Sequence, residues 1–420
     1  MKSAFLITVA ILFGFVGFSQ HKYSRGSAFP GYKGLIMAGY QGWFNAPEDG
    51  AHLNWNHYAT HGKFEPGFCK IDFWPDIREY QKLYKTPFMM ADGNPAYLFS
   101  SYDKETINTH FKWMKEYGLD GVFMQRSVAA LKNPDNLHHN DEVLMNAMEA
   151  SRKYGRAIAV MYDFSHIDEV NMDYNIVIKD WKHLVDSLHI ACLGSHQTYL
   201  YHHKKPLVGI WGVGFPERNN NLHATEKIID FLKNDPVYGG CSILLGVPAY
   251  WRDFGKDTEK DPYLHEIIRK ADIIRPWFVG RFNEESYDQF RERLKPDMAW
   301  CRANRIDYVP VVFPGFSWHN MHPESTAIQI PRNNGKFYWK QLVGSIHEGA
   351  EMIYVAMFDE IDEGTAIFKT TKNPPVGLSK FERFEDGIPE DYYLYLTGIA
   401  SSILKKKMPF QTQIPLPGIK

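Results

Sequence analysis

Short apolar segments recur along the chain, and stretches with helical spacing separate most of them. These segments lack the polar alternation of half-exposed strands, which predicts parallel strands buried on both faces. Between two of them, Lys104–Tyr117 places apolar residues at helical spacing, and Gly118 marks where that helix should end. Eight strands are predicted: Leu35–Tyr40, Pro87–Asp92, Gly121–Arg126, Ala157–Asp163, Leu207–Trp211, Cys241–Val247, Tyr308–Phe313 and Met352–Phe358.

Helical stretches alternate with the predicted strands, and this order predicts an α/β fold, a (β/α)8 barrel. The competing architecture is a doubly wound open sheet, which would need a Gly-rich phosphate-binding turn after its first strand. The segment Gly39–Trp43 is too bulky for such a turn. We therefore expect residues 21–420 to form a single barrel domain. The predicted helices are Asp76–Tyr84, Lys104–Tyr117, Asp141–Tyr154, Asn175–Leu188, Ala224–Lys233, Tyr263–Ala271, Ser286–Arg302, Phe337–Glu348 and Asp391–Lys405.

Residues 1–20 fall outside this pattern and are expected to be a signal peptide. Lys2 supplies a positive charge, Ala4–Phe18 is apolar, and Phe18-Ser19-Gln20 offers a cleavage site. The apolar run is short for a membrane span, and no second long run follows it. We expect an exported protein, periplasmic or secreted. The four cysteines lie apart among apolar residues, which favours buried free thiols, although export permits disulfides.

Composition narrows the class of ligand. The formal net charge of -2 provides no basic surface for nucleic acid or an anionic membrane. Aromatic residues make up 15% of the chain, and this surplus suits a groove that stacks against the apolar faces of sugars. The adjacent pairs His138-His139 and His202-His203 are expected to chelate poorly, because neighbouring side chains point apart. We expect no cofactor and no metal.

A barrel of this kind places its active site at the carboxyl ends of the strands. Nearly every predicted strand end carries an aromatic, amide or charged side chain. Together these side chains predict a pocket for a polyhydroxylated ligand. The candidate substrate-binding residues are Tyr40, Gln41, Trp43, Asp92, Gln125, Arg126, Asp163, Trp211, Trp251, Trp318 and His319.

The segment Phe358–Thr365 follows the last predicted strand and holds four carboxylates in five positions. Such acids repel one another, and the cost is tolerated mostly where the charge acts on a substrate or metal. Cleavage of a glycosidic bond needs one carboxyl group that keeps its proton and a second that stays ionised. Glu360 and Glu363 would share a face of a helical turn, so they are the candidate catalytic pair. Asp359 and Asp362 are expected to support them.

This segment resembles the Phe-Asn-Glu-Trp-His-Glu-Gly-Thr motif of glycoside hydrolase family 99, the endo-α-mannosidases and endo-α-mannanases, which has relatives in family 71. Tyr40-x-Gly42-Trp43-Phe44 is similar to that family's Tyr-x-Gly-Trp-Tyr stretch, and Arg275–Trp277 resembles its Arg-Pro-Trp stretch. The order of elements over residues 30–405 also fits the family's barrel. The whole chain is similar to exported Bacteroidetes proteins loosely labelled xylosidase/arabinosidase.

The resemblance implies an exported glycoside hydrolase that cleaves an α-linkage in a poly- or oligosaccharide with retention, through a 1,2-anhydro sugar. It implies that Glu360 is the base acting on the sugar 2-hydroxyl. Glu363 would protonate the leaving oxygen and later activate water. Two departures leave the sugar open. Asp359 and Asp362 replace the family's Asn and His, and the family's His-x-Glu-Pro segment appears as Tyr162–Ser165, where Asp163 is expected to stand in for an acid.

Two other functions fit part of the pattern. A non-catalytic carbohydrate-binding barrel would share the aromatic groove, but its two glutamates would lie far apart or in salt bridges. A polysaccharide lyase would use a Tyr or His base beside an arginine, a role open to Arg126 and Arg252. Ser-His-Asp hydrolysis lacks its Gly-x-Ser-x-Gly elbow, and the acid spacing matches no Ca²⁺ loop. Asp72 and Trp74 fit either a helix entry or a loop wall at the site.

Overall fold

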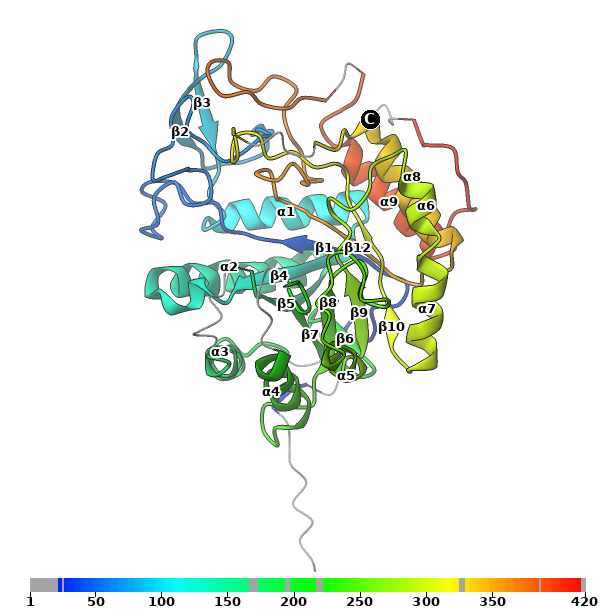
Figure 1. The fold of residues 1–420 in the computed structure, drawn as a ribbon. Coiled ribbons are helices and arrows are strands. Elements are labelled where there is room, and N and C mark those ends of the chain that lie inside the picture. The colour runs from blue at the N-terminus through cyan, green and yellow to red at the C-terminus, as the bar shows by residue number, and fades with distance from the viewer. Residues whose placement is uncertain are drawn as a thin grey trace, which may run out of the picture.

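A computed structural model describes residues 22–24, 26–165, 173–192, 197–216, 222–324, 329–384 and 387–416, so the predicted signal peptide lies outside the described residues. The main sheet is a curled set of parallel strands with helices around it (Figure 1). A short strand, β6 (Tyr201–His202), adds antiparallel to β7. The parallel strands are β1 (Ile36–Tyr40), β4 (Gly121–Ser127), β5 (Ala157–Asp163), β7 (Lys205–Trp211), β8 (Ser242–Val247), β9 (Ile273–Pro276), β10 (Asp307–Tyr308), β11 (Val311–Val312) and β12 (Ile353–Val355).

The parallel strands close into a ring. β1 lies between β12 and β4, and β10 pairs with β9 while β11 pairs with β12. Between β10 and β11, the Val309 N–H donates to the Ile274 carbonyl at 3.0 Å, and the Tyr354 N–H donates to the Pro310 carbonyl at 3.0 Å. Residues 307–312 therefore act as one strand, the seventh of the barrel. It joins β9, the sixth strand, to β12, the eighth strand. The predicted (β/α)8 barrel is confirmed.

Helix α2 (Pro134–Tyr154) starts seven residues before the predicted Asp141, and both of its ends carry local sequence signals. At the start of α2, the Asn133 side chain accepts from the N–H groups of Asp135 and Asn136, and Pro134 fits the first turn. The helix ends at Gly155, which adopts the left-handed conformation. No helix of the described ranges is both long and apolar enough to cross a bilayer. The helices are α1 (Lys104–Tyr117), α2 (Pro134–Tyr154), α3 (Asn175–Asp186), α4 (Leu222–Asn234), α5 (Tyr263–Arg269), α6 (Tyr287–Arg291), α7 (Leu294–Ala303), α8 (Lys336–His347) and α9 (Tyr392–Leu404).

Two predicted elements are wrong, and one barrel strand was not predicted. Pro87–Asp92 is not the second barrel strand, because β2 (Tyr84–Met89) pairs antiparallel with β3 (Pro95–Leu98) in a separate hairpin beside the barrel (Figure 1). Gly93, at φ 84°, closes that hairpin, and a tight hairpin turn joins antiparallel neighbours. The predicted helix at residues 76–84 instead forms turns that lead into β2. β9 was not predicted, because four residues that include an arginine and a proline do not show a strand pattern.

The four cysteines are free thiols, as predicted, and three of them are buried. Burial raises the pKa of the Cys241 thiol to about 12, and burial raises the pKa of the Cys69 thiol to about 11. A buried thiol with a raised pKa stays protonated and is a poor nucleophile. The cysteines of this barrel therefore serve packing.

Arg126, predicted to bind substrate, instead fixes helices to the outside of the barrel. Its guanidinium donates to both carboxylate oxygens of Asp180 on α3, at 2.9 and 2.5 Å, and to Asp141 on α2 at 3.0 Å. The Tyr162 hydroxyl of β5 donates to the same Asp180 carboxylate at 2.8 Å. Arg126 is 1% exposed. This buried network joins two strands to two helices, and the prediction of a substrate contact at Arg126 is wrong.

Replacing Arg126 with Met should lower the free energy of unfolding by about 3–5 kcal/mol, because Asp180 would keep a buried charge without its partner. Urea unfolding followed by circular dichroism measures this. The double variant Arg126→Met/Asp180→Asn should recover part of the loss, since neither charge remains. The control Arg302→Met, on the exposed face of α7, should stay within about 0.5 kcal/mol of the unmodified protein. Equal losses in the Arg126 and Arg302 variants would contradict the network.

Candidate active site

The four predicted acids lie in a tightly turned loop after β12. The Thr365 N–H donates to the Glu360 carbonyl at 3.1 Å, which folds the loop back on itself. Gly364 has φ 64°, and a Cβ there would lie 2.7 Å from the Ser317 nitrogen, so the turn requires glycine. Asp359, Glu360 and Asp362 are buried, whereas Glu363 is half-buried. The loop therefore presents one accessible carboxylate in front of three buried ones.

Asp359 joins this loop to the loop after the first barrel strand. Its two carboxylate oxygens accept from the backbone N–H groups of Gln41 and Gly42, each at 2.8 Å. Burial raises the pKa of Asp359 to about 6, although these two hydrogen bonds oppose the shift. The predicted supporting role of Asp359 therefore has a defined form: it positions the backbone that carries Gln41.

Glu360 is held by side chains on both of its oxygens. The Gln41 side-chain amide donates to one oxygen at 2.7 Å, and the Thr365 hydroxyl donates to the other. Burial raises the pKa of Glu360 well above its usual range, and the nearby charges of Glu363 and Asp362 raise it further. Burial therefore favours the protonated form of Glu360 in the free protein.

Glu363 lies near enough to Glu360 for its charge to act on that group. Two interacting carboxyl groups share their protons as a pair, so the first ionisation disfavours the second. The non-catalytic alternative expected the two glutamates to lie far apart. Their interaction instead favours a pair that can divide acid and base roles.

Asp362 lies beside His57, a residue that the sequence did not single out. The His57 Nε2 atom lies 3.1 Å from an Asp362 carboxylate oxygen. The His57 ring also packs against the Trp43 ring, with centroids 5.3 Å apart at an interplanar angle of 85°. Residues 48–57 contain several left-handed residues, including His57 at φ 67°, and no sequence motif marks this loop. Asp362 thus supports the wall that carries Trp43.

Other predicted substrate-binding residues approach the same end of the barrel from different strands. The Ser317 N–H donates to the Glu363 carbonyl at 3.0 Å, so the loop that carries Trp318 lies against the acid loop. The Gln125 amide lies 3.9 Å from the Met357 sulfur, just before the acids. The structure brings these residues to one end of the barrel: Gln41, Trp43, Gln125, Asp163, Trp211 and Trp318.

Arg275 and Trp277, at the end of β9, add to this group. The Arg275 guanidinium is fully buried and lies 4.1 Å from the centroid of the Tyr354 ring. The Trp277 ring packs against the Trp211 ring with centroids 5.2 Å apart. The Arg-Pro-Trp resemblance was the sequence signal for these residues, although β9 itself was not predicted. They connect β9, the sixth strand of the barrel, to Trp211 at the end of β7, the fourth strand.

Tyr40 and Trp251 were predicted to bind substrate, and both predictions are wrong. The Tyr40 hydroxyl lies 2.7 Å from the His110 Nδ1 atom of α1, outside the barrel. Successive side chains of a strand point to opposite faces, so Gln41 and Tyr40 cannot both face the site. Trp251 is fully buried and packs against Trp300 of α7, with ring centroids 4.8 Å apart.

Asp92 and His319 are also placed differently from the prediction. Asp92 lies in the exposed β2–β3 turn, where it accepts from the Asn94 amide at 2.9 Å. His319 has both ring nitrogens engaged: Nδ1 lies 2.9 Å from Asp72, and Nε2 lies 2.6 Å from the Lys380 carbonyl. Burial lowers the pKa of His319, but the Asp72 carboxylate outweighs it and the net pKa is raised. His319 therefore anchors a loop.

Asp72 is the organising residue of that loop, which settles its role as part of the loop wall. Its carboxylate accepts from the backbone N–H groups of His319 and Asn320, each at 2.9 Å, and from the Ser317 hydroxyl. Its own N–H donates to the Ile361 carbonyl at 2.9 Å. Asp72 thus connects the loop after the seventh strand to the acid loop after the eighth.

The arginines that kept a lyase open are committed to carboxylates on the helix side of the barrel. Arg252 donates to Asp297 of α7 at 2.7 Å, and Arg126 is bound to Asp180. A lyase of this kind needs a cation free to neutralise a uronate. Neither residue offers one, so the structure does not favour this alternative.

Glu360→Gln should change how stability depends on pH. Because the pKa of Glu360 is raised, the folded state binds more protons than the unfolded chain above about pH 4.3, and stability falls as pH rises through that window. The fall is up to about 1.4 kcal/mol per pH unit. Glutamine mimics the protonated acid, so the variant should gain stability relative to the unmodified protein between pH 5 and 8. Urea unfolding at both pH values measures the gain, and Glu266→Gln, exposed on α5, is the control. Parallel pH curves for the Glu360 variant and the unmodified protein would contradict the buried, protonated state.

Comparisons with known proteins place this site in context. No protein-family model matches the sequence. The chain is 22% identical over 362 residues to glycoprotein endo-alpha-1,2-mannosidase of Mus musculus, which covers 80% of this chain and 68% of the relative. It is 23% identical over 386 residues to the glycoprotein endo-alpha-1,2-mannosidase-like protein of Homo sapiens. This alignment covers 86% of this chain and 73% of that relative. The solved GH99 endo-alpha-mannosidase from Bacteroides thetaiotaomicron superposes with a TM-score of 0.66 at 15% identity, over 89% of this chain and 98% of that one.

These similarities extend well beyond the acid loop. The alignments with the curated relatives span most of this chain, and the structural superposition spans nearly all of the solved chain. The resemblance carried by Phe358–Thr365 is therefore part of a likeness that includes the whole barrel. The chain is similar in sequence to endo-α-1,2-mannosidases, and it shares the barrel fold of the solved GH99 endo-α-mannosidase.

Proposed function

We propose that the protein is a glycoside hydrolase of the endo-α-mannosidase type, which cleaves an α-linkage in a poly- or oligosaccharide. The observation that carries this proposal is the electrostatic interaction of buried Glu360 with half-buried Glu363 at the carboxyl end of the eighth strand. Similarity to the endo-α-1,2-mannosidases supports the class of reaction. Trp43, Trp211 and Trp318 supply aromatic faces for sugar rings around the pair.

The proposed reaction proceeds with retention in two steps. In the first, Glu360 takes the proton of the sugar 2-hydroxyl while that oxygen attacks the anomeric carbon, and Glu363 protonates the departing glycosidic oxygen. The product is a 1,2-anhydro sugar. In the second, Glu363 removes a proton from water as the water oxygen attacks the anomeric carbon, and Glu360 returns its proton to the 2-oxygen. Both glutamates end in their starting protonation states, so the cycle is balanced.

The proposed reaction requires that Glu363 is protonated and Glu360 is ionised when substrate is bound. In the free protein, burial favours the protonated form of Glu360, which is the more deeply buried of the two. A bound sugar would remove water from around Glu363 and raise the pKa of that group. Its 2-hydroxyl would donate to Glu360 and favour the charged form there. We propose that substrate binding moves the proton within the pair.

The surrounding residues would hold Glu360 in position for this exchange. Gln41 and Thr365 donate to its two oxygens, and Asp359 fixes the Gln41 backbone. A carboxylate that accepts two side-chain donors keeps its orientation while its charge changes. Asp163, at the end of β5, is proposed to contact substrate hydroxyls in place of the family's acid.

We also propose that the protein is exported to the periplasm or beyond. Lys2 and the apolar run Ala4–Phe18 support this. N-terminal sequencing of the protein from a cell fractionation tests it. A start after Gln20 in the exported fraction is expected, and a cytoplasmic protein that still begins at Met1 would refute it.

Glu360→Gln and Glu363→Gln should each reduce turnover by at least about 100-fold while the protein stays folded, because each removes one proton-transfer group. The measurement is release of reducing ends from a panel of α-mannans and algal glycans, with products mapped by mass spectrometry. Glu266→Gln, on the exposed face of α5, should keep full activity.

Three outcomes would contradict the proposal in different ways. Full activity in either glutamate variant would remove the two-glutamate mechanism. Tight glycan binding by the unmodified protein without cleavage of any bound glycan would indicate a carbohydrate-binding barrel. Products that absorb ultraviolet light through a new double bond would indicate a lyase.

A further inference from the structure

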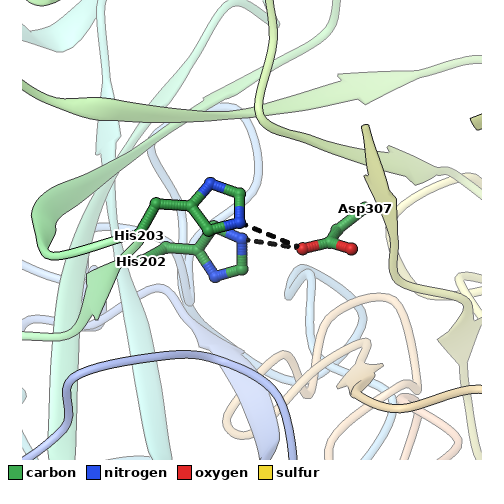
Figure 2. A group of neighbouring side chains, drawn as sticks. All are labelled: His202, His203 and Asp307. Atoms are coloured by element: carbon green, nitrogen blue, oxygen red, sulfur yellow. Dashed lines mark hydrogen bonds and ion pairs between the residues drawn. The ribbon is translucent and has the colours of Figure 1, made fainter. Parts of the chain in front are cut away.

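Two histidines and an aspartate meet at the end of the barrel opposite the acids. His202 ends β6, His203 follows it in the β6–β7 turn, and Asp307 begins β10 (Figure 2). β7 and β10 both start here, so the group lies at the amino-terminal ends of the strands. Figure 2 shows both imidazole rings directed at the same carboxylate. The proposed glycosidase chemistry uses none of these residues.

The expectation that neighbouring histidines point apart is wrong for this pair. His203 and Lys204 both adopt left-handed backbone conformations, at φ 49° and 65°, which turns the chain sharply after His202. The two imidazole rings come to lie with centroids 4.1 Å apart. By contrast, the ring nitrogens of His138 and His139 have separate hydrogen-bond partners, the Tyr102 hydroxyl and the Gly42 carbonyl.

The distances among the three ligand atoms fit a tetrahedral metal site. The Nε2 atoms of His202 and His203 lie 3.0 and 3.6 Å from the same Asp307 oxygen, and all three atoms lie within 4.8 Å of one another. Ligands that are each about 2.1 Å from a tetrahedral Zn²⁺ lie about 3.4 Å apart. His203 is the most exposed of the three, with 55% of its side chain accessible, so its ring can adjust.

The second oxygen of Asp307 is already held. Lys33 lies 2.9 Å from it and also pairs with Glu351 at 2.9 Å. A carboxylate that ligates a metal is commonly held by a second partner in this way. Lys33 thus orients Asp307 so that its remaining oxygen lies between the two imidazoles.

We propose that His202, His203 and Asp307 bind a divalent transition metal of the Zn²⁺ class. Two imidazoles and one carboxylate are ligands that such ions favour over Mg²⁺ or Ca²⁺, which take mainly oxygen ligands. The three residues leave a fourth position open to water. The metal would tie the β6–β7 turn to the seventh barrel strand.

Zinc binding to untagged protein, stripped with chelator and dialysed, tests the site. Isothermal titration with ZnCl2 should give one ion per chain, and the thermal unfolding midpoint should rise with zinc but not with the same concentration of MgCl2. Co²⁺ in place of zinc should give the strong visible absorption of a tetrahedral site. None of these measurements depends on glycosidase activity, so they test the metal site independently of the proposed function.

His203→Ala should weaken zinc binding by at least about tenfold and abolish the cobalt spectrum, since it removes a direct ligand. Asp307→Asn should do the same without changing the size of the side chain. The control His61→Ala removes another exposed histidine and should bind zinc like the unmodified protein. Circular dichroism confirms that each variant is folded. Failure of the unmodified protein to bind one zinc, or equal binding by the His203 and His61 variants, would overturn the proposal.

Discussion

The functional end of this barrel depends on keeping three carboxyl groups buried directly after β12. A buried carboxylate is costly unless donors replace the water it has lost. Gln41 and Gly42 supply two backbone donors to Asp359, and the Gln41 side chain supplies one to Glu360. A hydrogen bond to a charged group contributes roughly 1.5–3 kcal/mol. The loop after the first strand therefore cannot shift without leaving the acids of the eighth strand unsatisfied.

Strand composition predicted the barrel where strands are long and apolar, as in Gly121–Ser127 and Ala157–Asp163. It failed where a short apolar segment is compatible with either a barrel strand or another element. Pro87–Asp92 has the same apolar character, but the Gly93 turn makes it half of a hairpin. β9 was hidden for the opposite reason, because its arginine and proline mask a buried strand of four residues. In both cases the pairing with neighbouring strands determines whether the segment joins the barrel, and the pattern of the segment itself does not reveal that pairing.

The predicted site residues follow strand ends, but they do not all lie on the inner side of the barrel strands. Gln41 and Gln125 face inward, while the adjacent Tyr40 and Arg126 face the helices. Two successive residues at a strand end point to opposite faces of the sheet. Composition does not show which of the two faces the barrel interior. The deciding partners are His110 and Asp180, which lie 70 and 54 residues away in sequence. Only the packed structure shows that these two polar side chains bind partners on the helices.

The two departures from the resembled family motif have a physical logic. An asparagine at position 359 has one acceptor oxygen, whereas Asp359 uses two to hold consecutive backbone N–H groups. At position 362 the family's histidine is absent, but His57 brings an imidazole to Asp362 from the loop beside Trp43. The imidazole and the carboxylate have thus come together from different segments. Because His57 packs directly on Trp43, Asp362 acts on the segment that carries Trp43, while Glu360 keeps its own donors. That arrangement would allow the proposed substrate to differ from that of the resembled enzymes while Glu360 and Glu363 keep their proposed roles.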